Sequence, residues 1–195
     1  MASTVWNVPN VLSMIRLVFS GVLFVLIAVG AYLPATGLFV ITALTDFVDG
    51  WWARHFHQCT KLGRMLDPFA DKILICGTFL FLAAEPRMQA DWRLFQPWMA
   101  VVIMGREMLV TAIRGAMEGQ GVNFGAKWPG KIKMGFQCVA AIAGLLFLAW
   151  DEKTVPPWLY GTLVVSLWVT ILSTLQSGWG YIHAAIRHER EKNEA

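Results

Sequence analysis

Four aspartates at two helical spacings are the residues of this sequence best suited to chemistry. Asp46 and Asp49 are three residues apart and Asp67 and Asp71 are four apart, so each pair shares one face of a helix. A turn within His55 to Leu62 lets the two pairs point at each other. Four carboxylates crowded at low dielectric require a cation. Because the donors are hard oxygens with no Cys or His at ligand spacing, the pattern predicts Mg²⁺ or Mn²⁺.

The composition predicts that these aspartates belong to a membrane protein. Of the 195 residues, 56% are apolar and only 15% are charged, which is too apolar for a soluble domain of this size. We expect an all-α integral membrane protein with six transmembrane helices, forming a single domain over residues 1–195. The net charge of +3 gives no reason to expect nucleic acid as a partner.

Apolar stretches of about 20 residues, the length that crosses a bilayer core, define the predicted spans. They lie at about 11–33, 35–56, 63–84, 94–117, 131–150 and 157–183. A short interfacial segment at 1–10 precedes them, and we expect the first span to be retained because no signal-peptide cleavage site follows the N-terminus. The expected connections include a charged loop at 85–93 and a Gly-rich loop at 115–130, and a charged tail follows at 187–195.

The basic residues predict the orientation of the chain in the membrane. Of the 16 Lys and Arg residues, only Arg87, Arg93 and Lys153 fall in the loops on one side. The other 13 lie toward the opposite side, so the positive-inside rule places both termini in the cytoplasm. The aspartate motif then opens toward the cytoplasm too.

A second charged group surrounds the fourth and fifth spans. Arg106 lies inside the fourth span beside Glu107, where a charge needs a polar cavity or a partner. Four further basic residues lie at the facing ends of the two spans: Arg114, Lys127, Lys131 and Lys133. With Arg106 they could form an anion pocket. Their ordinary explanation is membrane topology and binding of anionic headgroups.

A carboxylate-held metal beside a basic pocket suits phosphoryl transfer between a lipid-soluble and a water-soluble substrate. Asp71, the outermost acid of its pair, is the natural acceptor of a proton from an attacking hydroxyl. Gly50 and Gly63 cost helix stability next to the acids, which predicts close approach of a flat or bulky group to the backbone. Tight helix packing is the alternative, and Ala53 fits it equally well.

Two other functions remain open from the residues alone. The aspartates could be salt-bridge partners that join helices, although charges inside a membrane are costly and usually functional. They could also serve a cation or proton transporter. Against transport, the acids lie at helix ends rather than at mid-membrane, basic residues surround them, and the two halves show no evident inverted repeat.

The motif resembles the signature of the CDP-alcohol phosphotransferase family, D-x-x-D-G-x-x-A-R-x8-G-x3-D-x3-D. The match has no departure and consists of Asp46, Asp49, Gly50, Ala53, Arg54, Gly63, Asp67 and Asp71. The chain length and the six expected spans also agree with the family. The resemblance therefore covers essentially the whole chain.

This resemblance implies a site in the bacterial cytoplasmic (inner) membrane that faces the cytoplasm, binds CDP-diacylglycerol and one or two Mg²⁺ or Mn²⁺ ions, and belongs to a homodimer among membrane lipids. It implies that Asp46, Asp49, Asp67 and Asp71 are metal ligands and that Asp71 is also the general base. Arg54 would contact the CDP diphosphate, and Gly50, Ala53 and Gly63 would line the nucleotide pocket.

Shorter motifs outside the aspartate signature look like the phosphatidylglycerophosphate synthase branch of the family. They are the runs at 7–16, 105–107 and 128–137, together with Arg114; Ser13 stands where that branch commonly has Thr. The implied acceptor is sn-glycerol 3-phosphate, whose phosphate would meet Arg106, Arg114 and Lys131, with Lys127 and Lys133 as helpers. A phosphatidylinositol phosphate synthase or a CDP-dependent cardiolipin synthase remains an alternative, because those acceptors also carry a phosphate.

Overall fold

The computed structural model describes residues 8–56, 61–119 and 128–193, and these ranges contain helices and no strand. The helices are α1 (Val8–Ala28), α2 (Tyr32–Phe56), α3 (Lys61–Ala84), α4 (Pro86–Gln89), α5 (Pro97–Gly119), α6 (Trp128–Ala149) and α7 (Pro157–Asn193). The six long helices match the six predicted apolar segments. The prediction of an all-α fold is therefore confirmed.

Two of the helices contain described segments that are long and apolar enough to cross a membrane. These segments are Val11–Ala28 in α1 and Pro157–Arg187 in α7. The described apolar segments of α2 and α6 are shorter, at Tyr32–Thr45 and Lys133–Ala149. The helices thus fit a membrane protein, whereas the crossing of the membrane by all six long helices stays a prediction.

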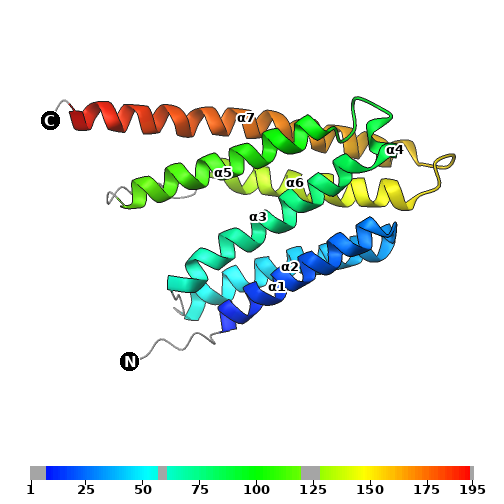
Figure 1. Cartoon of the computed structure of the whole chain (residues 1–195), viewed down its shortest axis with the longest axis horizontal. Helices are drawn as coiled ribbons and strands as arrows, with labels where there is room; N and C mark the ends of the chain where they lie inside the picture. The colour runs from blue at the N-terminus through cyan, green and yellow to red at the C-terminus, as the bar shows by residue number, and fades with distance from the viewer. Residues whose placement is uncertain (1–7, 57–60, 120–127, 194–195) are drawn as a thin grey trace.

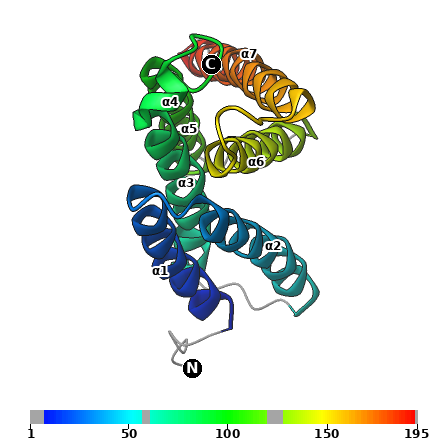
Figure 2. The same cartoon turned by 90° about the vertical axis from the view of Figure 1, so that its right-hand side faces the viewer.

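Helix α3 lies between the other helices and joins two halves of the molecule (Figures 1 and 2). On one side α3 packs against α1, which also packs against α2. On the other side α3 contacts α5 and α6, and α7 packs against both of these helices. We call α1 to α3 the N-terminal half and α5 to α7 the C-terminal half.

A continuous apolar core runs through both halves. Its fully buried members come from all six long helices and include Leu23, Ile27, Phe39, Phe79, Leu82, Met99, Ile103, Leu145, Leu163 and Leu167. Gly77 of α3 lets α1 approach closely, since a Cβ atom at this position would lie 2.1 Å from the ring of Phe24. The α1–α3 contact therefore depends on the missing side chain of Gly77.

The turn between α1 and α2 is set by Gly30, not by Pro34 as the expected first span to residue 33 implied. Gly30 has a φ of 77°, and its N–H bonds to Ile27 O while Ala31 N–H bonds to Leu26 O. This bonding pattern is a Schellman cap, which requires the left-handed conformation that glycine adopts freely. Pro34 lies in the first turn of α2, where its missing N–H costs no helical bond.

Two expected connections and the expected charged tail contain more helix than the sequence suggested. The charged loop at 85–93 includes the short helix α4, which begins at Pro86 and buries Met88. The Gly-rich loop expected at 115–130 is shorter, because α5 continues to Gly119 and α6 begins at Trp128. The charged tail is helical to Asn193. Residues of opposite charge three or four apart in that tail favour a helix, so a charged composition alone did not end α7.

Polar contacts join α4 and the segment that follows it to the C-terminal half, at the end of the molecule that carries α4, which we call the far end. Arg87 Nη1 donates to Trp150 O at 2.6 Å, and its guanidinium lies over the Phe147 ring at 4.7 Å. The Tyr160 hydroxyl donates to Asp91 Oδ2 at 2.5 Å. This bond, with a second from the Arg93 backbone N–H, lowers the pKa of Asp91.

Candidate active site

Helix ends that carry the predicted site residues gather at one end of the molecule. The second half of α2, the start of α3, the end of α5 and the start of α6 all lie at the end opposite α4, on the left in Figure 1. The N-terminal end of α1 and the C-terminal end of α7 lie there as well. The chain reversals between successive long helices thus bring together residues that are far apart in the sequence.

The aspartate motif lies on two helices, as its spacing predicted. Asp46 and Asp49 belong to α2, and Asp67 and Asp71 belong to α3. Of the motif residues, the structure describes the side chain of Asp71. The side chains of the other seven, Asp46, Asp49, Gly50, Ala53, Arg54, Gly63 and Asp67, lie outside the described part, so their mutual geometry stays a prediction.

Asp71 pairs with Arg16 of α1. Arg16 Nη1 donates to Asp71 Oδ1; the Arg16 side chain is 2% exposed and that of Asp71 is 30% exposed. A buried guanidinium is stable only with a charged or polar partner, and this pair joins α1 to α3. The pairing therefore places one acid of the motif at the α1–α3 contact and orients its carboxylate.

Glu107 is the centre of a second ionic group in the C-terminal half. Lys133 Nζ of α6 donates to Glu107 Oε1, and Arg106 Nη1 lies 3.3 Å from the same oxygen. Lys133 is buried at 3% exposure. Arg106 also donates from Nη2 to Ser177 Oγ of α7 at 2.7 Å. Side chains from three helices thus form one network.

Tyr181 of α7 extends this network toward the end of α5. Its hydroxyl accepts a bond of 3.1 Å from Arg114 Nη2. The guanidinium carbon of Arg106 lies 5.8 Å from the centre of the Tyr181 ring, and that of Arg114 lies 5.9 Å from it. We call Arg106, Glu107, Arg114, Lys133, Ser177 and Tyr181 the basic cluster.

The basic cluster has an excess of positive charge and unused donors. Three cations oppose the single carboxylate of Glu107, and the Nε atoms of Arg106 and Arg114 are buried without a hydrogen-bond partner among the described residues. Such a site suits an anion. Three of the five residues predicted for an anion pocket, Arg106, Arg114 and Lys133, are thereby brought together. Lys131 lies in α6, but its side chain and all of Lys127 lie outside the described residues.

The acidic motif suits a hard divalent cation by its donor set. Four carboxylates on two consecutive helices match the oxygen ligands that Mg²⁺ and Mn²⁺ prefer, and the described carboxylate of Asp71 is fixed in place by Arg16. Among the side chains that the structure describes, no group of three or more His, Cys, Asp or Glu could hold a metal. The side chains of three of the four predicted ligands, Asp46, Asp49 and Asp67, lie outside the described part.

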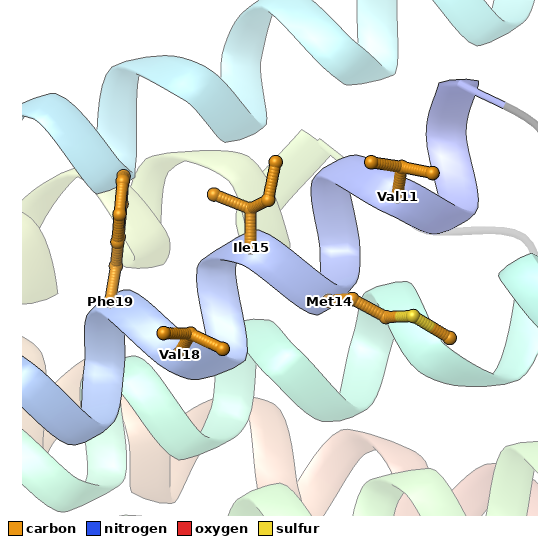
Figure 3. Close-up of a pocket in the computed structure, with 5 residues that line it drawn as sticks. All are labelled: Val11, Met14, Ile15, Val18 and Phe19. Carbon is orange, nitrogen blue, oxygen red and sulfur yellow. The ribbon is translucent and has the colours of Figure 1, made fainter.

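An apolar groove of about 290 Å³ lies along α1 near Arg16 (Figure 3). It is lined by Val11, Met14, Ile15, Val18 and Phe19. Met14, Ile15 and Val18 are exposed, so this face of α1 offers apolar surface and no polar partner. The groove therefore suits hydrocarbon and not the phosphate groups of a substrate.

Four contact residues were not assigned to the site from the sequence: Arg16, Glu107, Ser177 and Tyr181. Arg16 and Glu107 carried a signal, because each is a charge within an apolar segment and such charges need partners. Ser177 and Tyr181 carried none, since a serine and a tyrosine near the end of an apolar helix are ordinary. Their contacts arise only because α7 packs against α5.

The fold and these contacts define a class of protein, an all-helical chain that presents an acidic motif and a basic cluster at the same end of a helical bundle. The model of the CDP-alcohol phosphatidyltransferase family matches residues 6–178. This match covers most of the chain, including the aspartate motif and every residue of the basic cluster except Tyr181. The chain belongs to that family, as the resemblance predicted.

Curated relatives from several bacteria carry one name, CDP-diacylglycerol--glycerol-3-phosphate 3-phosphatidyltransferase. The Bacillus subtilis relative is 38% identical over 77% of this chain and 72% of its own length. The relative from Pectobacterium atrosepticum is 32% identical over 94% of this chain and 97% of its own length. That from Escherichia coli K12 is 30% identical over 92% and 95%.

Proposed function

We propose that this chain transfers the phosphatidyl group of CDP-diacylglycerol to sn-glycerol 3-phosphate, giving phosphatidylglycerol phosphate and CMP. The observation that carries this proposal is the similarity, over nearly the full length of both chains, to relatives named for that reaction. The basic cluster supports it, because a phosphate-bearing acceptor needs cationic partners. The acceptor alcohol is the part of the proposal that the aspartate motif does not determine.

The N-terminal half binds the CDP-lipid. Arg54 contacts the diphosphate, while Gly50, Ala53 and Gly63 line the nucleotide pocket and allow the nucleotide to approach the backbone. The apolar groove on α1 offers an apolar environment to the lipid chains, and the same helix contacts Asp71 of the motif through Arg16. The headgroup of a membrane-dissolved substrate thus reaches the polar site without leaving the membrane.

Asp46, Asp49, Asp67 and Asp71 hold one or two divalent cations, Mg²⁺ or Mn²⁺. When bound, the metal neutralises the phosphate oxygens and polarises the reacting phosphorus. Arg16 has a separate task, since its contact with Asp71 orients this carboxylate and prevents it from turning away from the site.

The chemical step is attack by the acceptor hydroxyl on the lipid-bearing phosphorus. A bond forms between the glycerol oxygen and this phosphorus, and the bond from the phosphorus to the bridging oxygen of CMP breaks. A carboxylate oxygen of Asp71 takes the proton of the attacking hydroxyl. CMP leaves with the electron pair of the broken bond.

The C-terminal half binds the phosphate of the acceptor. Arg106 and Arg114 supply bidentate donors, and Lys131 and Lys133 add positive charge, with Lys127 nearby in the sequence. Glu107 holds Arg106 and Lys133 at this position. Because Glu107 neutralises only one of the cations, the pocket keeps its attraction for an anion.

The six long helices cross the cytoplasmic membrane of a bacterium as one domain over residues 1–195, with both termini and the site facing the cytoplasm. At 37 residues and 1.5 Å per residue, α7 is about 55 Å long and exceeds a bilayer core of about 30 Å. Its charged C-terminal part therefore extends into the cytoplasm. The functional unit is a homodimer surrounded by membrane lipids.

A radiolabel assay of the purified protein with CDP-diacylglycerol and a panel of acceptors tests the reaction. The panel contains glycerol 3-phosphate, inositol phosphate, phosphatidylglycerol and serine. We expect metal-dependent release of CMP with glycerol 3-phosphate. Product formed only from inositol phosphate or phosphatidylglycerol would move the chain to another branch of the family. Metal-dependent ion flux across vesicles without turnover would support a transporter instead.

A further inference from the structure

Tyr181 contacts both arginines of the basic cluster. Its hydroxyl accepts a hydrogen bond from Arg114 Nη2, and both guanidinium groups lie within the range of about 6 Å at which an aromatic ring attracts a cation. The two arginines are eight residues apart on α5, or about two helical turns. A single side chain of α7 therefore connects two cations that lie about two turns apart on the facing side of α5.

Ser177 and Gly178, one turn earlier on α7, shape the same contact. Ser177 Oγ accepts a bond of 2.7 Å from Arg106 Nη2. A Cβ atom at Gly178 would lie 3.3 Å from Arg106 Cγ, which is tighter than an ordinary van der Waals contact. The stem of Arg106 thus lies directly against the α7 backbone, and its end is held by the residue before Gly178.

These contacts leave part of each arginine available. Arg106 and Arg114 keep buried Nε donors without a hydrogen-bond partner among the described residues. Contacts to α7 fix the two guanidinium groups, so little side-chain entropy is lost when an anion binds them. The neutral residues of α7 hold the cations without neutralising their charge, unlike the ionic contact that Glu107 makes.

We propose that Tyr181, with Ser177 and Gly178, forms a positioning site on α7 that holds Arg106 and Arg114 ready for the acceptor phosphate. This inference rests on the proposed function, because it assigns the arginines to the phosphate of the acceptor. Tyr181 itself does not touch the reacting atoms. It acts through the arginines, so its effect falls on the apparent affinity for the acceptor and not on the chemical step.

Steady-state kinetics of four variants in the full-length protein test the proposal. Tyr181→Phe removes one hydrogen bond and keeps the ring, so we expect KM for glycerol 3-phosphate to rise about 3-fold. Tyr181→Leu also removes the ring and should raise it about 10-fold or more. Ser177→Ala and Gly178→Ala act on Arg106 alone and should each raise it about 2- to 5-fold.

The KM for CDP-diacylglycerol and kcat at saturating acceptor should stay within about twofold of wild type in all four variants. Trp179→Phe is the matched control, since Trp179 is an aromatic residue of the same helix that is 71% exposed and should leave every constant unchanged. Inorganic phosphate is the second probe, and its inhibition constant against the acceptor should rise in parallel with KM.

Two results would overturn the positioning role: an unchanged acceptor KM in Tyr181→Leu, or a matching rise in KM for both substrates. Thermal melting in detergent shows whether each variant is folded. If Tyr181→Leu folds poorly, the acceptor KM values of Tyr181→Phe and Ser177→Ala decide the test. The wild-type acceptor panel tests the proposed function independently. If the wild type uses another phosphate-bearing acceptor, the same constants are measured for it, and unchanged values again reject the role of α7.

Discussion

The two halves of the molecule hold candidate sites of opposite charge, the aspartate motif and the basic cluster, and they assemble these sites in different ways. In the N-terminal half, the acids are concentrated in one stretch of sequence on two consecutive helices, α2 and α3. In the C-terminal half, the basic cluster takes three residues from α5, one from α6 and two from α7. The aspartate motif is therefore formed by one short stretch of sequence, whereas the basic cluster depends on how three helices pack.

This difference has a chemical reason. Metal ligands must converge on one small ion with little tolerance in distance, so short fixed spacings on adjoining helices suit them. A phosphate is larger, and cations of flexible length can reach it from several directions. The comparison leads us to expect that substitutions in the N-terminal half change turnover, while substitutions in the C-terminal half change acceptor affinity.

The largest expected effect belongs to Asp71. Asp71→Asn removes the proposed proton acceptor and should lower kcat by about 10³-fold, within the range of roughly 10² to 10⁴ for loss of a general base. Binding of CDP-diacylglycerol, measured by equilibrium binding of the radiolabelled lipid, should be largely retained. Turnover close to that of wild type would show that Asp71 is not the base. It would also contradict the assignment of the chemical step to the N-terminal half.

Substitution of Arg106 should produce the contrasting result. Arg106→Ala removes charged hydrogen bonds worth about 1.5–3 kcal/mol, which corresponds to about a 10- to 100-fold rise in KM for glycerol 3-phosphate. The KM for CDP-diacylglycerol should change by less than about twofold, as steady-state kinetics with each substrate varied will measure. Equal changes for both substrates would contradict the assignment of the C-terminal half to the acceptor.

Substitution of Arg16 tests whether stability and turnover depend on the orientation of the Asp71 carboxylate. Arg16→Met leaves Asp71 without its guanidinium partner and should lower stability by about 2 kcal/mol, less than for a fully buried pair because Asp71 is partly exposed. Thermal melting in detergent and kcat are the measurements. Ser20→Ala is the control, since the Ser20 hydroxyl bonds only to the α1 backbone in the described contacts. If the losses of stability caused by Arg16→Met and Asp71→Asn add up in the double variant, the two side chains do not act as a unit.

The smallest effect is expected at the far end, which belongs to neither substrate site. Hydrogen bonds to the Asp91 carboxylate lower its pKa, so they stabilise the fold above the unfolded pKa of about 3.9, and this contribution is lost as pH falls through the lower folded pKa. Asp91→Asn should lower stability by less than about 1 kcal/mol at pH 7, because the Asp91 side chain is partly exposed to solvent.

The melting difference between Asp91→Asn and wild type should shrink below about pH 4. Tyr160→Phe removes the main hydrogen-bond donor to Asp91 and should cause the same loss of stability at pH 7. Kinetic constants at pH 7 should be unchanged in both variants. A melting difference that is independent of pH, or a change in acceptor KM, would show that the separation of the far end from the site is wrong.

The sequence alone was enough for the helical class, the positions of the six long helices and the family. Apolar segments of bilayer length and an acid motif with fixed spacing are local features, so they can be read without knowing the packing. Helix ends were less predictable. The end of the first helix was predicted just before Pro34, although the cap at Gly30 sets it. The charged tail was expected to follow the last helix, but it is part of α7.

Only the tertiary structure decided which charges are partners. Arg16 is 55 residues from Asp71, and Tyr181 is 67 residues from Arg114. Helical periodicity says which face a residue occupies but not which helix that face meets, because this depends on the packing of the entire apolar core. The sequence thus determined the chemical groups available, and the packing of α3 with α1 and of α7 with α5 determined how they are held.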